Sequence, residues 1–293
     1  MAAPTRAKRR LGAFLLKLRT EADVTTLSAA AELRTVATTV NRYESGHVLP
    51  VWSSTVNMLR LYGASDKEID TALKLWEEAK EEPKPVRLPA GTPPSFRRLA
   101  NAEREAGWIK TLVSWPIPGL LQSEGYLRAL LAAAHWLQDP RARVEALVTA
   151  RLSRQQNLQD PDGLHLHAII DESVILRNVG GPSVMLEQLR HLLAAGERPN
   201  ITIQVMPLAV GAYGSMSGAC TIVGYPSNDE AGVYLEYPAG GAWVDDEDDV
   251  RRFTAMFDDA SEAALPWVGT AKLIQQQIRA IETYDAQSGV AQE

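Results

Sequence analysis

The first eighty residues carry apolar side chains at the three- and four-residue spacing that is typical of amphipathic helices. The first apolar face consists of Leu11, Phe14, Leu15 and Leu18. A later face starts at a capping-box pair, Ser65 and Glu68, and continues through Ile69, Ala72, Leu73, Trp76 and Ala79. Two short helical stretches and a helix near Trp52 to Tyr62 lie between these faces. We therefore expect residues 1–80 to form an all-α domain of five short helices.

The pattern in the rest of the chain mixes strand and helix periodicities. Strands are expected at residues 164–170, 201–206, 218–225 and 232–237. The strand at 201–206 alternates, so we expect it to be buried on one face only. Helical spacing is expected from an N-cap at Asp139-Pro140 to about Leu158, from Val250 to Ala264 and from Trp267 to Ile281. These elements predict an α+β domain with a small sheet.

A proline-rich segment separates the two patterns. Residues 80–95, KEEPKPVRLPAGTPPS, contain five of the 17 prolines. Each proline lacks a backbone N–H and biases the preceding residue away from helix. We expect a semi-extended linker at 81–95, between an N-terminal domain at 1–80 and a second domain at 96–293.

Charge is distributed unevenly between these parts. The whole chain has a net charge of −6. Residues 1–62 carry nine Lys or Arg and four Asp or Glu, a net charge of +5, so the remainder carries −11. A basic N-terminal part on an acidic body suits a polyanionic partner, although chance clustering explains a charge of this size equally well.

Composition narrows the class of protein further. No apolar run approaches ~18 residues, so no membrane helix is expected. The basic N-terminus is followed by an apolar stretch that Lys17 and Arg19 interrupt, which does not fit a signal peptide. The single cysteine, Cys220, excludes a disulfide framework and favours a cytoplasmic location.

The segment from Thr26 to Pro50, TLSAAAELRTVATTVNRYESGHVLP, has the pattern of a helix-turn-helix. A helix with Leu27, Ala30 and Ala31 is followed by a turn near residues 33–35 and a second helix over about residues 36–45. Val40 and Tyr43 are expected to face inward, and small alanines let the two helices approach closely. Gly46 suits a left-handed position after the second helix. Such a second helix enters the major groove of duplex DNA.

The phrases LLKLRTEA, from Leu15 to Ala22, and VNRYESG-x-x-x-P, from Val40 to Pro50, resemble the XRE (phage-repressor-like) helix-turn-helix family. The resemblance covers about residues 9–62. It implies an ion pair between Arg19 and Glu44 that joins the first helix to the recognition helix. The base-reading positions implied by the family are Ala37, Thr38, Thr39 and Arg42. The implied phosphate contacts are Arg9, Arg10, Lys17 and Thr26.

Three positions depart from the family pattern. Arg34 stands where the turn usually has glycine, and Ala37 stands where glutamine is frequent. Val36 replaces a small polar cap, for which Thr35 could substitute. These departures leave the fold expectation intact and put the individual base contacts in question.

The second domain also has a resemblance, carried by IPGLLQSEGYLRALL, HAIIDESVILRNVGGPSVMLEQLRHL, ITIQVMP, GAYGSMSG and VYLEY. Together these phrases resemble the C-terminal domain of actinobacterial regulators of the WhiJ type. The resemblance runs from about Ser95 to Glu282. That domain is often labelled antitoxin-like and has no agreed biochemical function. The resemblance implies a small partner protein encoded beside the regulator.

Several side chains of this domain have two interpretations. His165, His167 and Asp171 either hold a metal ion or form a polar sheet face, with Asp171 capping the next helix. The acidic run at 245–249 either caps a helix or binds a basic partner. Cys220 fits a core position. The Trp and Tyr side chains either pack the core or line a pocket for a small hydrophobic effector. We predict no catalytic residue, no metal, no cofactor and no enzymatic activity.

These observations predict a sequence-specific DNA-binding transcriptional regulator. Its C-terminal domain is expected to mediate dimerisation, partner binding or ligand sensing. A homodimer on double-stranded DNA is expected because one short recognition helix reads few base pairs. The alternative is an antitoxin-like interaction module that sequesters a small partner without sequence-specific DNA binding.

Overall fold

The computed structural model describes residues 6–81, 88–90, 92–133, 141–214, 218–226, 231–237 and 240–290. The chain forms two compact units, Met1–Pro85 and Val86–Glu293. The division falls within the expected linker at 81–95, of which residues 82–87 and 91 lie outside the described residues. Each unit has its own hydrophobic core.

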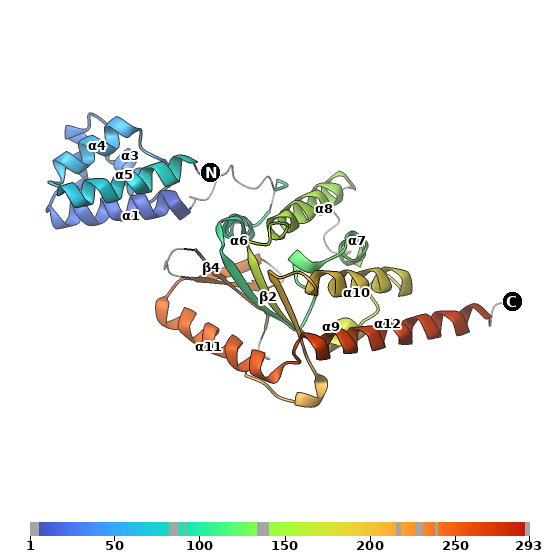
Figure 1. Cartoon of the computed structure of the whole chain (residues 1–293). Helices are drawn as coiled ribbons and strands as arrows, with labels where there is room; N and C mark the ends of the chain where they lie inside the picture. The colour runs from blue at the N-terminus through green and yellow to red at the C-terminus, as the bar shows by residue number, and fades with distance from the viewer. Residues whose placement is uncertain are drawn as a thin grey trace. The chain divides into compact units, whose positions relative to one another are not determined.

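The first unit is all-α, as predicted (Figure 1). Its described helices are α1 (Arg6–Glu21), α2 (Thr26–Glu32), α3 (Ala37–Glu44), α4 (Trp52–Leu61) and α5 (Asp66–Glu81). The apolar face predicted for the first helix forms the centre of the core, because Leu11, Leu15 and Leu18 are each less than 5% exposed. The expected capping box is present at α5, where the backbone N–H of Ser65 donates to Oε2 of Glu68 over 2.7 Å.

The second unit is built on a six-stranded sheet in the order β3-β2-β1-β4-β5-β6. Its strands are β1 (Trp108–Val113), β2 (His165–Asp171), β3 (Ile201–Met206), β4 (Cys220–Gly224), β5 (Gly232–Tyr237) and β6 (Gly240–Val244). Strands β1, β2 and β3 run parallel, and β4, β5 and β6 add antiparallel strands on the other side of β1. The predicted α+β class with a small sheet is confirmed.

Helices cover both faces of this sheet (Figure 1). The helices are α6 (Pro94–Glu105), α7 (Glu124–Ala133), α8 (Arg141–Gln155), α9 (Glu172–Leu176), α10 (Pro182–Gly196), α11 (Glu247–Ala263) and α12 (Trp267–Val290). Helix α11 packs on one face through side chains such as Phe257, and α6, α10 and α12 pack on the other. None of the helices that the structure describes is both long enough and apolar enough to cross a membrane.

One expectation for this unit needs correction. Strand β3 was expected to be buried on one face only, but Gln204 and Met206 on the supposedly open face are also buried. The end of α11 covers them, and Nε2 of Gln204 donates to the carbonyl of Ser261 over 3.0 Å. The helix expected to run to about Leu158 is α-helical to Gln155 and ends in a 3-10 turn over Gln156–Leu158. Its expected N-cap at Asp139-Pro140 lies outside the described residues.

Candidate nucleic-acid interface

The turn between α2 and α3 has an unusual backbone position at Arg34. Its φ angle is +52°, in the left-handed region that side chains with a Cβ adopt at a cost. This geometry explains why glycine is the usual residue at this place in the turn. Helix α3 starts after Val36, whose side chain makes no capping hydrogen bond. The N-cap position belongs to Val36, and among the described residues the side chain of Thr35 makes no hydrogen bond to this helix, so the suggestion that Thr35 caps it is wrong.

Close approach of α1 and α3 depends on Gly12. A Cβ at Gly12 would lie 2.5 Å from the carbonyl oxygen of Glu44 and 2.6 Å from that of Tyr43. A hydrogen atom is the largest substituent that fits there, so Gly12 allows the two backbones to touch.

Helix α2 differs in part from expectation. Ala30 is buried as expected, together with Ala29, but Ala31 is exposed and Leu27 is 75% exposed.

Arg19 and Glu44 form a bidentate ion pair between α1 and the end of α3. Nε of Arg19 donates to Oε1 of Glu44 over 2.7 Å, and Nη2 donates to Oε2 over 3.0 Å. The third guanidinium nitrogen, Nη1, donates to the carbonyl of Val24 over 2.8 Å. The hydrogen bonds that Arg19 donates to Glu44 raise the pKa of Arg19. Burial, with a further contribution from the charge of Glu44, raises the pKa of Tyr62.

The pair fixes the orientation of α3 and thereby determines which side chains remain open to solvent. Val40 and Glu44 are buried, while Thr38 and Arg42 are exposed. Ala37 and Thr39 are half-buried, and Ala37 packs against the core. The four predicted base-reading residues are thus divided between the open face and the flanks of the helix.

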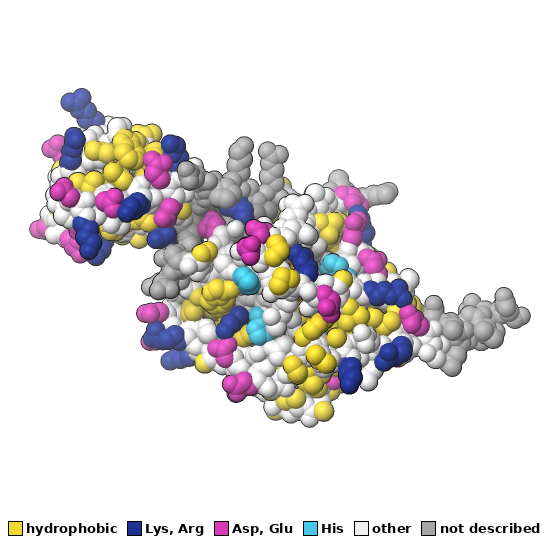
Figure 2. Space-filling model, in the orientation of Figure 1, with side chains coloured by type: hydrophobic (Ala, Val, Ile, Leu, Met, Phe, Trp, Pro, Cys, Tyr) yellow, Lys and Arg dark blue, Asp and Glu magenta, His cyan; other side chains and the backbone are white. Residues whose placement is uncertain are grey.

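Asn41 belongs to the open face and was missed by the sequence analysis. It lies three residues after Thr38 and beside Arg42, so helical spacing could have found it. Val36 at the start of the helix is 61% exposed. Figure 2 shows a group of apolar side chains among scattered charged ones on the visible face of this unit.

The predicted phosphate contacts have different surroundings. Nη1 of Arg10 is held by Oε2 of Glu78 at 2.8 Å. Lys17 is exposed and lies 3.8 Å from Glu21, one helical turn away. Arg9 and Thr26 are half-buried at the surface. Lys17 is therefore the most accessible cation among the four predicted contacts, and Arg10 would have to leave Glu78 in order to meet a phosphate.

Each unit matches a known protein family. Residues 96–276 match a domain of unknown function (DUF5753), and residues 10–72 match a helix-turn-helix domain. The chain belongs to the DUF5753 family. Its N-terminal unit is a helix-turn-helix domain of the kind found in DNA-binding regulators. No match was found among curated proteins or among solved structures.

The three side chains considered for a metal site have different surroundings in the DUF5753 domain. His165 is exposed, whereas Nε2 of His167 lies 2.6 Å from Oε1 of Gln204. Burial lowers the pKa of His167. Asp171 caps α9, because its Oδ1 accepts from the backbone N–H of Ser173 over 2.9 Å. Within the described ranges no three His, Cys, Asp or Glu side chains gather as they would around a metal ion.

The structure also places the acidic run, Cys220 and several aromatic side chains of this domain. Asp246 in the acidic run caps α11, and its side chain accepts from the backbone N–H groups of Asp248 and Asp249. Cys220 is 2% exposed and belongs to the core. Among the aromatic side chains, Tyr126 and Tyr234 are buried in the core, and Tyr234 also lines a cavity together with Trp115.

Proposed function

We propose that this chain is a sequence-specific transcriptional regulator that reads double-stranded DNA with the open face of α3. The observation that carries the proposal is the division of that helix into two faces. Val40 and Glu44 anchor one face in the core, and Thr38, Asn41 and Arg42 stand on the other. The match of residues 10–72 to a helix-turn-helix domain supports the same function.

The exposed side chains have the chemistry that base edges require. A guanidinium such as that of Arg42 donates two hydrogen bonds to O6 and N7 of guanine, and an asparagine pairs in the same manner with adenine. Among the described residues no carboxylate forms an ion pair with Arg42, so its guanidinium is available to DNA. Thr38 adds a hydroxyl and a methyl group for a thymine edge. Lys17 and Thr26 are assigned to phosphates, which position the protein without reading sequence.

The DUF5753 domain has a regulatory role in this proposal. We assign to it dimerisation, the docking of a small partner protein or the sensing of a ligand, and we assign no catalytic step to the chain. Two copies would place two recognition helices about 34 Å apart along the duplex, which multiplies specificity. The resemblance of residues 95–282 to regulators of the WhiJ type supports the docking of a small partner protein.

The proposal is tested by selecting fragments of the host genome with the full-length protein and sequencing what is bound. We expect a short, two-fold symmetric motif to be enriched. The variant Thr38→Ala with Arg42→Ala should lose this enrichment, while Lys67→Ala, which removes an exposed cation from α5, should keep it. Affinity for the selected motif should fall steeply with added salt because phosphate contacts release counterions.

Two results would overturn the proposal. One is the absence of any enriched sequence at low ionic strength. The other is equal enrichment by the parent and the double variant. Either result, combined with stable capture of a small protein from the host, would favour the interaction module without sequence-specific DNA binding.

A further inference from the structure

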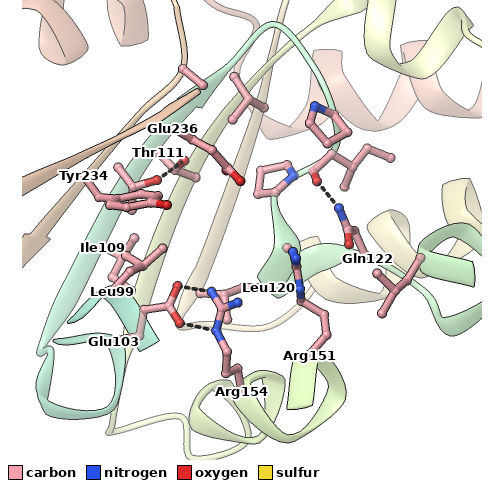
Figure 3. Close-up of a pocket in the computed structure, with 18 of the residues that line it drawn as sticks. Leu99, Glu103, Ile109, Thr111, Leu120, Gln122, Arg151, Arg154, Tyr234 and Glu236 are labelled. Carbon is pink, nitrogen blue, oxygen red and sulfur yellow. Dashed lines mark hydrogen bonds and ion pairs between the residues drawn. The ribbon is translucent and has the colours of Figure 1, made fainter. Parts of the chain in front are cut away.

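A cavity of about 200 Å³ lies between the sheet and the helices of the DUF5753 domain (Figure 3). Its walls are largely apolar and include Leu99 of α6, Ile109 of β1 and Leu120 of the 3-10 turn at Gly119–Leu121. Four charged side chains of the described chain also reach it: Glu103, Arg151, Arg154 and Glu236. Apolar walls with a few converging polar groups are the usual composition of a small-molecule site.

Glu103 and Arg154 neutralise each other in the wall of this cavity. Nε of Arg154 donates to Oε2 of Glu103 over 2.6 Å, and Nη2 donates to Oε1 over 2.5 Å. The two side chains are 3% and 4% exposed. Nη1 of Arg154 and Oε1 of Gln122 are buried without a hydrogen-bond partner in the described parts of the chain. The wall therefore has a neutral ion pair with one unused donor, and a separate unused acceptor.

Arg151 supplies a positive charge that this pair does not compensate. Its guanidinium lies against Gly119, where a Cβ would overlap Nη1, and 5.6 Å from the centre of the Phe96 ring. No carboxylate within the described ranges is close enough to form an ion pair with it. Burial, with a further contribution from Arg154, lowers the pKa of Arg151 to about 10, so the group remains protonated at neutral pH.

Glu236 limits the kind of anion that this charge would attract. It is exposed on β5, and in Figure 3 its carboxylate points toward the cavity from the sheet side. The charge of Glu236 attracts Arg151 without forming an ion pair with it. A ligand with two negative charges would meet one cation that lacks an ion-pair partner and would also face this carboxylate. A single negative charge therefore matches the cavity better than a phosphate dianion does.

We propose that the cavity binds a small organic acid with one carboxylate and an apolar body. The carboxylate would accept hydrogen bonds from Arg151 and from Nη1 of Arg154, because a guanidinium fork matches a carboxylate in geometry. The body would lie against Leu99, Ile109 and Leu120. A cavity of ~150 Å³ holds a benzene ring, so the present one admits a single ring or a short alkyl chain.

The regulatory meaning of this site rests on the proposed function, whereas binding of the acid can be measured without DNA. Titration calorimetry on the full-length protein would use 3-phenylpropionate and octanoate as probes, with 3-phenylpropanamide and octanamide as uncharged matches. We expect at least one acid to bind and its amide to bind at least ~tenfold more weakly. No binding of either acid up to about 10 mM, equal binding of acid and amide, or tighter binding of inorganic phosphate would overturn the proposal.

Variants assign the binding to Arg151. Arg151→Met should weaken binding of the acid at least ~tenfold. Arg190→Met removes an exposed guanidinium that is paired with Glu282, and it should leave the affinity for the acid unchanged. If Arg151→Met does not fold, Arg151→Lys keeps the charge without the fork and should still weaken binding. Glu236→Gln should retain or improve affinity. Unchanged affinity in the Arg151 variants would refute the site. If the acid does not bind at Arg151 but the parent protein still enriches a DNA motif, only the cavity proposal is refuted and the DNA-binding proposal is unaffected.

Discussion

The ion pair between Arg19 and Glu44 makes a quantitative prediction about the stability of the N-terminal unit. The change Glu44→Ala removes the carboxylate and leaves the guanidinium of Arg19 at a site where its side chain is 14% exposed. Breaking a buried ion pair costs about 3–5 kcal/mol because the remaining charge is uncompensated. Arg19 keeps its hydrogen bond to Val24 and some contact with water, so we expect the lower end, about 3 kcal/mol.

Native-state hydrogen exchange on the full-length protein measures this loss of stability in the N-terminal unit separately from the second unit. The slowest amides of α1 and α3 report on opening of the N-terminal unit, and those of β2 report on the other unit. A loss of about 3 kcal/mol makes exchange roughly a hundredfold faster in α1 and α3. Exchange in β2 should remain unchanged, because that strand belongs to a separate compact unit.

A matched control comes from the exposed pair Lys17 and Glu21, whose side chains are 66% and 57% exposed. Glu21→Ala should change exchange no more than about twofold, because exposed pairs are worth ~0.5 kcal/mol or less. Combining Arg19→Met with Glu44→Leu should restore much of the protection, since no unpaired charge remains. If Glu44→Ala has no more effect than Glu21→Ala, the pair does not lock α1 to α3.

Three further predictions follow from other residues. Arg42→Ala should lose at least ~1 kcal/mol of discrimination between the selected motif and a site with one base pair changed; equal discrimination would remove Arg42 from the base-reading set. Arg34→Gly should stabilise the N-terminal unit by about 0.5 kcal/mol in denaturant unfolding, since relief of the left-handed strain outweighs the entropy of glycine; a clear loss of stability would contradict this. Burial raises the pKa of the Cys220 thiol to about 11, so labelling by a thiol reagent at pH 8 should be at least about a hundredfold slower than in the unfolded chain and should rise with pH; fast labelling of native protein would show that β4 opens.

Much of the N-terminal unit could be predicted because its structure depends on neighbours in sequence. The apolar face of Leu11, Leu15 and Leu18 and the capping box at Ser65 are local signals, and both are present. The left-handed glycine expected after the recognition helix is also present, with a φ of +72° at Gly46. Local signals are sufficient here because each helix forms its own backbone hydrogen bonds.

The sheet was predicted less completely. Four of its strands were expected, and β1 and β6 were not. Strand β1 has the sequence WIKTLV, in which Lys110 interrupts the apolar residues. That lysine reaches Asp258 of α11, 2.6 Å from Nζ to Oδ1 and 148 residues away in sequence. The residues near β1 in the sequence do not include Asp258, whose charge stabilises this lysine in a central strand.

For the candidate sites, the sequence shows which chemical groups are present, and the fold shows which of these groups are accessible. Sequence placed Thr38 and Arg42 on a recognition helix, but only the fold showed that Ala37 turns toward the core and that Glu78 holds Arg10. The cavity of the DUF5753 domain had no local signal at all. Its charges come from α6, α8 and β5, and their balance depends on distances between segments that the chain brings together only on folding.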